Sequence, residues 1–461
     1  MVSITNARGD SLGPSAEERM TAGKALRARV PRTAHAKWTP TANRPDPVAL
    51  LKESDRGRLE ELLPIRYARM RVSPFAFFRG AAALMASDLA GTPATKIRVQ
   101  ACGDCHLLNF GGYGSPERRL VFDINDFDET LPAPWEWDVK RLAASVVLAA
   151  RDKKMGEGRC ADAARAMVAS YRTHMREYAQ MPALDAWYSH IDVDLFIEKA
   201  KTSRDKQHWK KVERAAYTQT GEYLVPKITK VSKGMRRIID HPPLIYHPRS
   251  FARIDEHLRA LFQRYRLTLP EERRVILDRY HIVDIARKVV GVGSVGTRCD
   301  IALLMAGKDD ATVLQFKQAL PSVLEAYAGK SRYTNHGERV VTGQRMLQAA
   351  SDVFLGWTRV DAGRDYYFRQ LCDMKMKFDL DSMSKSGWLE YVQICGWTLA
   401  RAHARTGDAA LIGGYLGKNS KFDDAIGEFA VTYADQTEQD YEALLKAIRA
   451  GKVRNAETGA E

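Results

Sequence analysis

Long apolar runs are missing from this chain, and cysteine is scarce. No run of eighteen consecutive apolar residues occurs among the 461 residues, so we expect no transmembrane helix. The first ten residues lack the apolar segment of a secretory signal, and we therefore expect a cytoplasmic protein. The chain has only six cysteines, which in that compartment we expect to be reduced thiols.

The chain also lacks an internal repeat and any recognisable nucleic-acid-binding module with interleaved aromatic residues. Its hydrophobic content of 45% and charged content of 28% are ordinary for a globular protein. The net charge of +14 favours anionic ligands. Basic residues concentrate between Lys199 and Arg237, where we predict either a solvated face or a surface for an anionic partner. The stretch contains Lys210, Lys211, Lys227, Lys230, Lys233, Arg236 and Arg237.

What is present is a loop typical of phosphotransferases, Cys102-Gly-Asp-Cys-His-Leu-Leu-Asn-Phe110. An Asn placed five residues after a Gly-Asp pair has the catalytic-loop spacing of kinases. Phosphoryl transfer needs a carboxylate near the acceptor hydroxyl and oxygen ligands for magnesium. We therefore predict that Asp104 is the catalytic base and that Asn109 is a catalytic-loop magnesium ligand.

A second acidic motif follows, Leu120-Val-Phe-Asp-Ile-Asn-Asp-Phe-Asp-Glu129. An apolar strand that ends in Asp-Phe-Asp supplies the metal-binding carboxylates that such a loop requires. Asp126 precedes Phe, as in Asp-Phe-Gly loops, and is the favoured metal ligand. Asp123 or Asp128 is the second candidate, and we expect Glu129 to be exposed to solvent.

A phosphate-binding segment is indicated later in the chain, where Gly291, Gly293 and Gly296 have G-x-G-x-x-G spacing and Ser294 lies among them. Apolar and β-branched residues flank these glycines on both sides, so a hairpin over phosphates fits better than a dinucleotide-binding turn. The next predicted strand carries Lys317, the expected phosphate-binding lysine. Its carboxylate partner is predicted to be Glu338, with Glu325 as the alternative.

The order of these motifs is unusual, because the catalytic loop precedes the Gly-rich loop. We predict an α+β, circularly permuted protein-kinase-like fold, with a small β-rich lobe embedded between two mostly helical segments. The helix expected to lead into the catalytic loop lies at Trp388–His403, and adenine is expected near Cys372–Lys375. A further helix is expected over Ser73–Leu89, with Ser73 as N-cap and Pro74 at its first position.

The predicted division of the chain follows from this order. It consists of a flexible basic arm at 1–45, a helical lobe with the catalytic and metal-binding loops at 46–283, a β-rich nucleotide-binding lobe at 284–375 and C-terminal helices at 376–461 that complete the helical lobe.

At these motifs the chain resembles the bacterial family named domain of unknown function 2252, over roughly residues 45–445. The shared phrases include Leu63-Pro-Ile-Arg-Tyr67, Gly103-Asp-Cys-His-Leu-Leu-Asn-Phe110 and Asn125-Asp-Phe-Asp-Glu-Thr130. The family name assigns no activity. The two loops are also similar to those of aminoglycoside phosphotransferases, in which His stands where this chain has Cys102. That second resemblance implies a kinase-like fold and bound Mg-ATP, but analogy fixes no substrate.

Parts of the sequence also fit other kinds of site. Cys102 to His106 also fits the C-x-x-C-H pattern of haem attachment, which we reject because no export signal is visible, and a zinc pair lacks a second pair of ligands. In a conventional motif order Asp408 would be the base and Asp423 the metal ligand, but Gly413 stands where Asn is required. His403 is expected to be a packed helix residue.

We therefore expect an ATP- and Mg²⁺-dependent phosphotransferase whose acceptor is a small molecule of unknown identity. Two rival hypotheses remain at the sequence level. The first is a kinase-fold enzyme that transfers AMP, for which the same residues would serve. The second is a non-catalytic nucleotide-binding regulator, which the full set of acidic residues disfavours because a binder need not retain a base.

Overall fold

The computed structural model describes residues 13–200, 202–232, 234–248, 255–360, 363–376 and 378–456. The helices before the first long strand region are α1 Ala16–Ala25, α2 Pro47–Ser54, α3 Leu63–Met70, α4 Pro74–Gly80 and α5 Ala82–Ala90. The strands around the catalytic loop are β1 Arg98–Ala101, β2 Phe110–Gly114, β3 Leu120–Ile124 and β4 Leu131–Pro134. The central helices are α6 Trp135–Asp152, α7 Glu157–Tyr178, α8 Ala183–Tyr188, α9 Asp194–Lys199, α10 Ser203–Thr218 and α11 Gly221–Ile228.

The second half alternates strands and helices. Its first elements are β5 Thr229–Ser232, β6 Met235–Ile238, β7 Ile245–Tyr246, α12 Asp255–Leu267 and α13 Glu271–Leu277. The sheet strands and their helices are β8 His281–Lys288, β9 Cys299–Met305, β10 Ala311–Ala319, α14 Glu325–Ala328, α15 His336–Leu347, β11 Gly356–Arg359 and β12 Asp365–Gln370. The chain closes with α16 Lys385–Thr406, α17 Ala409–Leu416 and α18 Lys421–Arg449.

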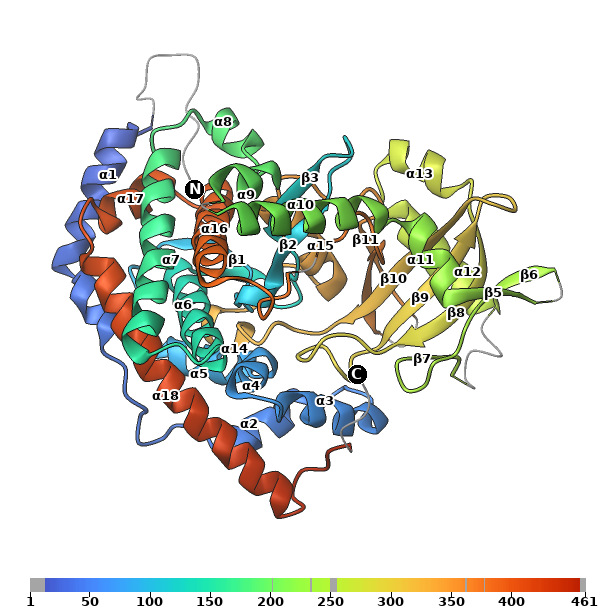
Figure 1. The fold of residues 1–461 in the computed structure, drawn as a ribbon, viewed down its shortest axis with the longest axis horizontal. Helices are drawn as coiled ribbons and strands as arrows, with labels where there is room; N and C mark the ends of the chain where they lie inside the picture. Colours follow the sequence, from blue (N-terminus) through green and yellow to red (C-terminus); the bar gives the residue numbers. More distant parts are fainter. Residues whose placement is uncertain are drawn as a thin grey trace.

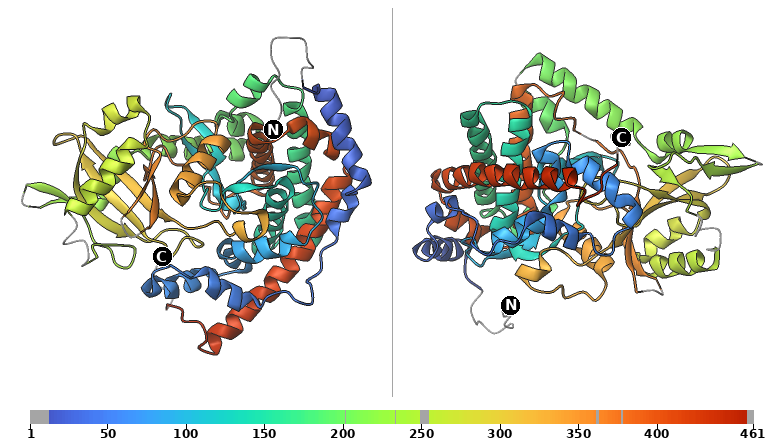
Figure 2. Two further views of the ribbon diagram at one scale, coloured as in Figure 1. Left: turned by 180° about the vertical axis from the view of Figure 1, so that it is seen from behind. Right: turned by 90° about the horizontal axis from the view of Figure 1, so that it is seen from below.

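The molecule is α+β, with a helical part and a sheet on opposite sides (Figure 1). The helical part is built on α6, which is buried along nearly its whole length, and on α7, α16 and α18, which pack around it. Figure 2 shows α18 crossing α6 and α7 in the view from below. The hairpin of β2 and β3 lies between the helices and the sheet and carries the catalytic loop at its start.

The sheet is antiparallel, in the order β11-β12-β10-β9-β8-β7. Successive side chains along each strand point to opposite faces of the sheet. Leu314 and Phe316 of β10 pack against Phe262 of α12 in one apolar core, whereas Lys317 points from the opposite face toward the helical part. The predicted hairpin around the Gly-rich segment is present, because β8 and β9 pair from His281↔Met305 to Arg287↔Asp300.

The predicted division of the chain needs two corrections. Residues 16–36 are not a flexible arm: α1 packs on α17, and Arg27 donates hydrogen bonds to the carbonyls of Gly414 and Tyr415. Residues 1–12 of that arm lie outside the described residues. The boundary at 284 is also too late, since α12 packs on the sheet rather than on the helical part.

The remaining expectations about elements agree with the structure except for one predicted helix, which is divided. Ser73 caps α4 through its hydroxyl, and Pro74 is the first helical residue, but the helix predicted over Ser73–Leu89 is divided at Ala81. The helix expected at Trp388–His403 is α16. The six cysteines form no disulfide. Among the described helices, none combines the length and apolar character that crossing a bilayer requires.

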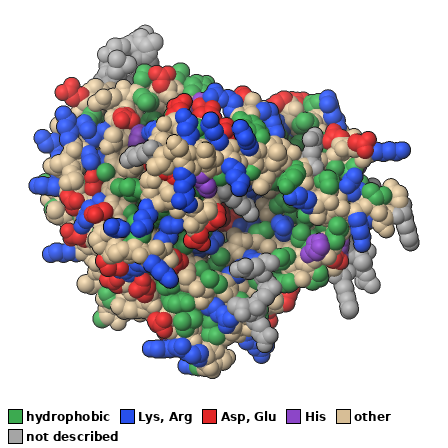
Figure 3. Space-filling model, in the orientation of Figure 1, with side chains coloured by type: hydrophobic (Ala, Val, Ile, Leu, Met, Phe, Trp, Pro, Cys, Tyr) green, Lys and Arg blue, Asp and Glu red, His purple; other side chains and the backbone are tan. Residues whose placement is uncertain are grey.

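The basic stretch from Lys199 to Arg237 forms α10, α11 and the hairpin of β5 and β6. Lys210, Lys211 and Lys227 are exposed there, while Lys233 lies outside the described residues. Lys and Arg side chains are also spread over the rest of the visible face in Figure 3. An anionic partner for this stretch stays a prediction.

Candidate functional site

The catalytic-loop segment begins where β1 ends. Asp138 of α6 accepts hydrogen bonds from the backbone N–H groups of Cys102 at 2.8 Å and Gly103 at 3.0 Å. Gly103 has φ +83°, and a Cβ there would lie 2.4 Å from the carbonyl oxygen of Glu129. Only glycine fits this position. The turn places Asp104 next to the second acidic motif.

Asp104 is held by one of its two carboxylate oxygens. Arg141 of α6 donates from Nε at 2.8 Å and from Nη2 at 2.5 Å to Oδ1. The other oxygen, Oδ2, accepts no hydrogen bond from the described residues and lies 3.9 Å from Nε2 of His106. Asn109 donates from Nδ2 to the Asp104 carbonyl at 2.7 Å, which leaves its own amide oxygen available. The loop therefore presents two outward-facing oxygens, one from each predicted residue.

A polar stripe on α6 holds this loop. Asp138, Arg141 and Ser145 lie on one helix face, and Ser145 accepts a hydrogen bond from the Leu107 N–H at 3.1 Å. Nε2 of His403 in α16 donates to Asp138 at 3.2 Å, and its Nδ1 accepts from the Tyr171 hydroxyl at 2.9 Å. His403 is therefore the packed histidine that was expected. Sequence reasoning missed Arg141, although its spacing from Asp138 and Ser145, at positions i, i+3 and i+7, puts three polar residues on one face of the helix.

The aspartates of the second acidic motif have two different roles: Asp123 is part of the core, whereas Asp126 and Asp128 line the cavity. Asp123 is buried, and both of its oxygens accept hydrogen bonds from Nη2 of Arg401, at 2.6 and 2.7 Å. Its Oδ2 also accepts from the Ala349 N–H at 3.0 Å. The prediction of Asp123 as a metal ligand is corrected by this geometry, because its lone pairs are used within the core.

Asp126 and Asp128 line the cavity but differ in their partners. Asp128 accepts from Lys317 Nζ in a short contact and from the Tyr367 hydroxyl at 2.8 Å. Asp126 accepts only the Asp128 N–H, at 3.2 Å, among the described residues. Burial and the neighbouring Asp128 raise the pKa of Asp126, whereas Lys317 outweighs burial and lowers the pKa of Asp128. Asp126 is thus the carboxylate with oxygens to spare for a cation.

Lys317 lies in the expected place with a different partner. Burial opposes its charge, but Asp128 raises the pKa of Lys317 well above its ordinary value. Its Nζ also donates to Ser294 Oγ at 2.6 Å. The predicted partner Glu338 lies in the first turn of α15, and its carboxylate makes no hydrogen bond or ion pair with a described residue of the cavity. Its neighbour Arg339 instead donates to the carbonyls of Asp128 and Thr130, so that α15 holds the acidic loop through its backbone.

The Gly-rich loop closes over Asp104. A Cβ on Gly293 would lie 2.8 Å from the Arg79 carbonyl oxygen and 3.9 Å from Oδ2 of Asp104. The loop is also held from outside: Arg58 donates to the carbonyls of Gly293 at 2.8 Å and Val295 at 2.7 Å, and Arg69 donates to Gly291 at 2.5 Å. Gly296, with φ +92°, accepts from the Leu59 N–H and lies outside the cavity lining.

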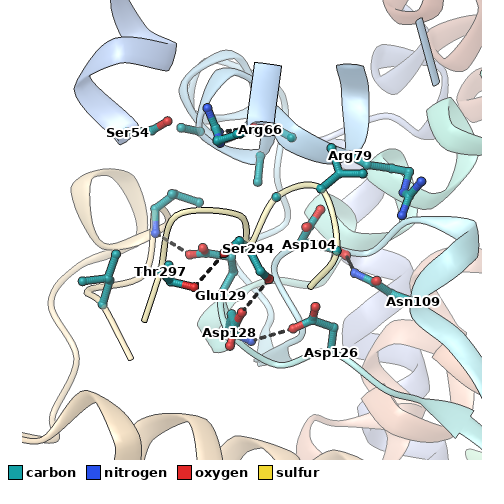
Figure 4. A pocket seen from close by; sticks show the side chains of 18 of the residues that line it. Ser54, Arg66, Arg79, Asp104, Asn109, Asp126, Asp128, Glu129, Ser294 and Thr297 are labelled. Carbon is teal, nitrogen blue, oxygen red and sulfur yellow. Dashed lines mark hydrogen bonds between the residues drawn. The ribbon is translucent and has the colours of Figure 1, made fainter. Parts of the chain in front are cut away.

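These segments enclose a cavity of about 110 Å³ (Figure 4). Small-molecule sites usually occupy roughly 300–1,000 Å³, so this cavity is smaller than a usual binding site. The predicted residues that line the cavity are Asp104, Asn109, Asp126, Asp128, Gly291, Gly293 and Ser294. These predicted residues come from three separate stretches of the sequence that meet at one place.

Two further titratable groups line the cavity. Glu129 was expected to be exposed, but it accepts the Val323 N–H at 2.7 Å, and burial raises the pKa of its carboxyl to about 7. Burial lowers the pKa of His106 to about 3, so this imidazole is neutral in the folded protein at neutral pH.

The donor set fits magnesium bound together with phosphate oxygens. Asp126 and Asn109 offer one carboxylate and one amide oxygen, which are the hard ligands that Mg²⁺ prefers. In the described part of the chain, the cavity contains no cluster of three metal-ligating side chains. Magnesium usually relies on one or two carboxylates plus substrate phosphates, so a bare ion is not the expected ligand.

The alternative sites have structural roles. Asp408 caps α17 by accepting the Leu411 N–H, and Asp423 pairs with Arg172, so neither lines the cavity. Cys102, Cys105 and Asp138 form a buried cluster with metal-ligating atoms. Burial raises the pKa values of both thiols, and the Asp138 carboxylate already accepts two backbone hydrogen bonds, which disfavours a metal–thiolate site.

Comparison with known proteins gives one match. The sequence model of a family described as an uncharacterized protein conserved in bacteria (DUF2252) matches residues 58–447. No curated protein and no solved structure matches the chain. The match covers the catalytic loop, the acidic motif, the Gly-rich loop and Lys317.

Proposed function

This chain belongs to the DUF2252 family, and from that premise we propose that it is an ATP-dependent phosphotransferase with a circularly permuted kinase-like fold. The observation that carries the proposal is the meeting of three predicted segments in one cavity, with Lys317 bound to one of their carboxylates. Asp104 and Asn109 come from the loop after β1, Asp126 and Asp128 from the loop after β3, and Gly293 and Ser294 from the loop between β8 and β9, while Lys317 of β10 reaches the same carboxylate.

The permutation is supported by the order of elements in space. The strands β8, β9 and β10 run as a meander, α15 follows, and β12 then pairs with β10 while β11 lies at the edge. If the chain is read from β8 to its end and then from its start, the Gly-rich loop, the lysine strand, the long helix α16 and the catalytic loop follow in kinase order. Tyr391 of α16 donates to the Leu107 carbonyl at 2.6 Å, so this helix does support that loop.

The side chains have separable roles in this proposal. Oδ2 of Asp104 accepts the proton of the acceptor hydroxyl, while Arg141 fixes the carboxylate through Oδ1. Lys317 has three N–H donors, of which two are used by Asp128 and Ser294, so one remains for a phosphate oxygen. Asp126 and Asn109 would hold Mg²⁺, which neutralises phosphate charge when bound. The lack of a disulfide among the six cysteines, all of which lie within the described residues, favours a cytoplasmic site of action.

The test uses ATP labelled at the α or γ position, incubated with the purified protein and Mg²⁺. Phosphotransfer or slow hydrolysis releases or moves only the γ label, and Asp104→Asn should slow the appearance of that signal by about two to four orders of magnitude. Transfer of the α label to an acceptor or to the protein would instead favour an AMP transferase. Binding of ATP without movement of either label would favour a regulator.

A further inference from the structure

Arg79 stands apart from the other arginines of the cavity. Arg58 and Arg66 also line it, but the guanidinium of Arg58 is bound to loop carbonyls, and that of Arg66 donates to Asp55 and to the Gly80 carbonyl. The buried Nε of Arg79 has no partner, and no hydrogen bond or ion pair of its guanidinium occurs in the part of the chain that the structure describes.

The backbone around Arg79 is fixed on both sides. Nη2 of Arg141 donates to the Phe78 carbonyl at 3.0 Å, and Nη2 of Arg66 donates to the Gly80 carbonyl at 2.8 Å. These two arginines donate hydrogen bonds to carbonyl oxygens at the end of α4, where the longer helix expected from the sequence is divided. The side chain of Arg79 therefore extends from a rigid support and not from a mobile loop.

Charge and position make Arg79 an anion-binding group. A cation removed from water is costly unless a negative group compensates it. Asp104 is the carboxylate whose charge acts on Arg79, but the Oδ1 of that carboxylate is already bound to Arg141. The protein thus keeps a partly desolvated guanidinium beside the proposed base without giving it a carboxylate of its own.

We propose that Arg79 anchors an oxyanion subsite for the acceptor, so that the substrate is a small hydroxylated compound bearing a phosphate or carboxylate group. This inference rests on the phosphotransferase function proposed above. Arg79 and Asn109 lie to one side of Asp104 in Figure 4, whereas Ser294 and Asp128 lie to the other. Ser294 and Lys317 are the proposed phosphate ligands, and Asn109 with Asp126 would hold Mg²⁺. The guanidinium of Arg79 bonds to none of these described residues, which leaves it for the acceptor.

The planar guanidinium suits this task, because its donors can bind two oxygens of a phosphate or carboxylate at once. A hydroxyl on the same acceptor would then face Oδ2 of Asp104. A polycationic acceptor, such as those of the aminoglycoside phosphotransferases that the loops resemble, would be repelled by Arg79. The subsite thus distinguishes this chain from the enzymes to which its loops are similar.

The experiment measures phosphate binding by calorimetry to the full-length protein saturated with Mg²⁺ and a non-hydrolysable ATP analogue. The analogue occupies the γ-phosphate position, so added inorganic phosphate reports on a second oxyanion site. We expect phosphate but not glycerol to bind the parent, Arg79→Gln to weaken it at least tenfold, and Arg79→Lys to have an intermediate effect. Arg56→Gln is the matched control, because Arg56 is exposed and pairs only with Glu53 in the described chain.

The outcomes separate the two proposals. Absence of phosphate binding to the analogue-saturated parent, or equal binding to Arg79→Gln, overturns the subsite. Weaker binding of the analogue but not of ADP to Arg79→Gln would make Arg79 a γ-phosphate ligand and also overturns it. If the analogue does not bind at all while phosphate binding still depends on Arg79, the oxyanion site stands and the phosphotransferase function fails. Circular dichroism of each variant checks that it is folded.

Discussion

At the residue scale, the most telling feature is the unequal treatment of chemically similar carboxylates. Asp123 has both oxygens bound within the core, Asp128 is paired with Lys317, and Asp104 and Asp126 each keep an oxygen that faces the cavity. Identical residue types within a few positions of one another thus have different uses. Which one does chemistry depends on the partners that folding supplies from distant segments.

This difference predicts that one substitution lowers turnover and that another lowers stability. Asp104→Asn keeps the size of the side chain but removes the proton acceptor, so turnover of ATP should fall by about two to four orders of magnitude while Mg-ATP still binds. Asp123→Ala strands the buried Arg401 and should cost about 3–5 kcal/mol of stability. Calorimetric titration and urea unfolding of both variants separate the roles, and unchanged turnover in Asp104→Asn would exclude Asp104 as the base.

Glu129 predicts a pH dependence of stability. Its folded pKa of about 7 lies above the ordinary value of 4.5, so the folded state holds a proton that the unfolded chain releases between those values. The stability contributed by this group is complete below about pH 4.5 and is lost as the pH rises to about 7. The free energy of unfolding of the parent relative to Glu129→Gln should therefore decline over this window and then level off.

Urea unfolding across the same pH range provides the measurement. His106 contributes in the opposite sense, since its pKa of about 3 lies below the ordinary 6.5 and its contribution is lost as the pH falls. That contribution is common to both proteins and cancels in the difference. Parallel stability curves for the parent and Glu129→Gln would contradict the assigned burial of this carboxyl.

At the element scale, the site depends on two rigid supports. The face of α6 that carries Asp138, Arg141 and Ser145 holds the catalytic loop, and α4 lies directly against the Gly-rich loop at Gly293. The outer arginines Arg58 and Arg69 bind carbonyls of the Gly-rich loop. Within the loop the N–H groups of Val295 and Thr297 donate to carbonyls, whereas that of Gly293 has no hydrogen-bond partner among the described residues. Backbone N–H groups in such loops are natural phosphate ligands.

The close approach at Gly293 yields a second substitution test. Gly293→Ala would place Cβ 2.8 Å from the Arg79 carbonyl oxygen, so the loop must shift away from Asp104. Affinity for Mg-ATP should fall at least tenfold, and the melting temperature should also fall, because Val292 and Val295 of this loop are buried in the core. Gly158→Ala is the control: nothing lies within 4 Å of its Cβ, and the change should slightly stabilise α7. Equal nucleotide affinity in both variants would place the phosphates elsewhere.

Sequence patterns predicted the elements better than their partners. Alternating apolar residues and glycine spacing were enough to predict the β8–β9 hairpin and the strand of Lys317, because these signals are local. The pairing of Lys317 with Asp128 instead of Glu338, and of Asp123 with Arg401, depends on side chains 189 and 278 positions apart. No local pattern contains that information. The role of Arg79 could not be predicted for the same reason, because its lack of a hydrogen-bond partner among the described residues is a property of the folded cavity.

At the scale of the whole molecule, the helical part consists of two segments that are separated in sequence by the sheet. Residues of both the helical part and the sheet segment line the cavity. The helical part is built from residues on both sides of the sheet segment, and α16 and α18 pack with α6 and α7 although more than two hundred residues separate them. The helical part is therefore complete only after the sheet segment has been traversed along the chain, because its last helices follow that segment in sequence. A ligand in the cavity contacts both parts and should stabilise them together.

This coupling gives the final prediction, which amide hydrogen exchange can test. Mg-ATP should slow exchange in the Gly-rich loop, in β10 and in the loops that carry Asp104 and Asp126, although these segments lie far apart in sequence. Mg²⁺ alone should give little protection, because the cavity lacks a three-ligand cluster in the described chain and depends on phosphate oxygens. Lys317→Ala and Asp126→Ala should reduce both the protection and the rise in melting temperature. Protection confined to the sheet, with the catalytic loop unchanged, would mean that the nucleotide does not bridge the two parts and that the proposed site is misassigned.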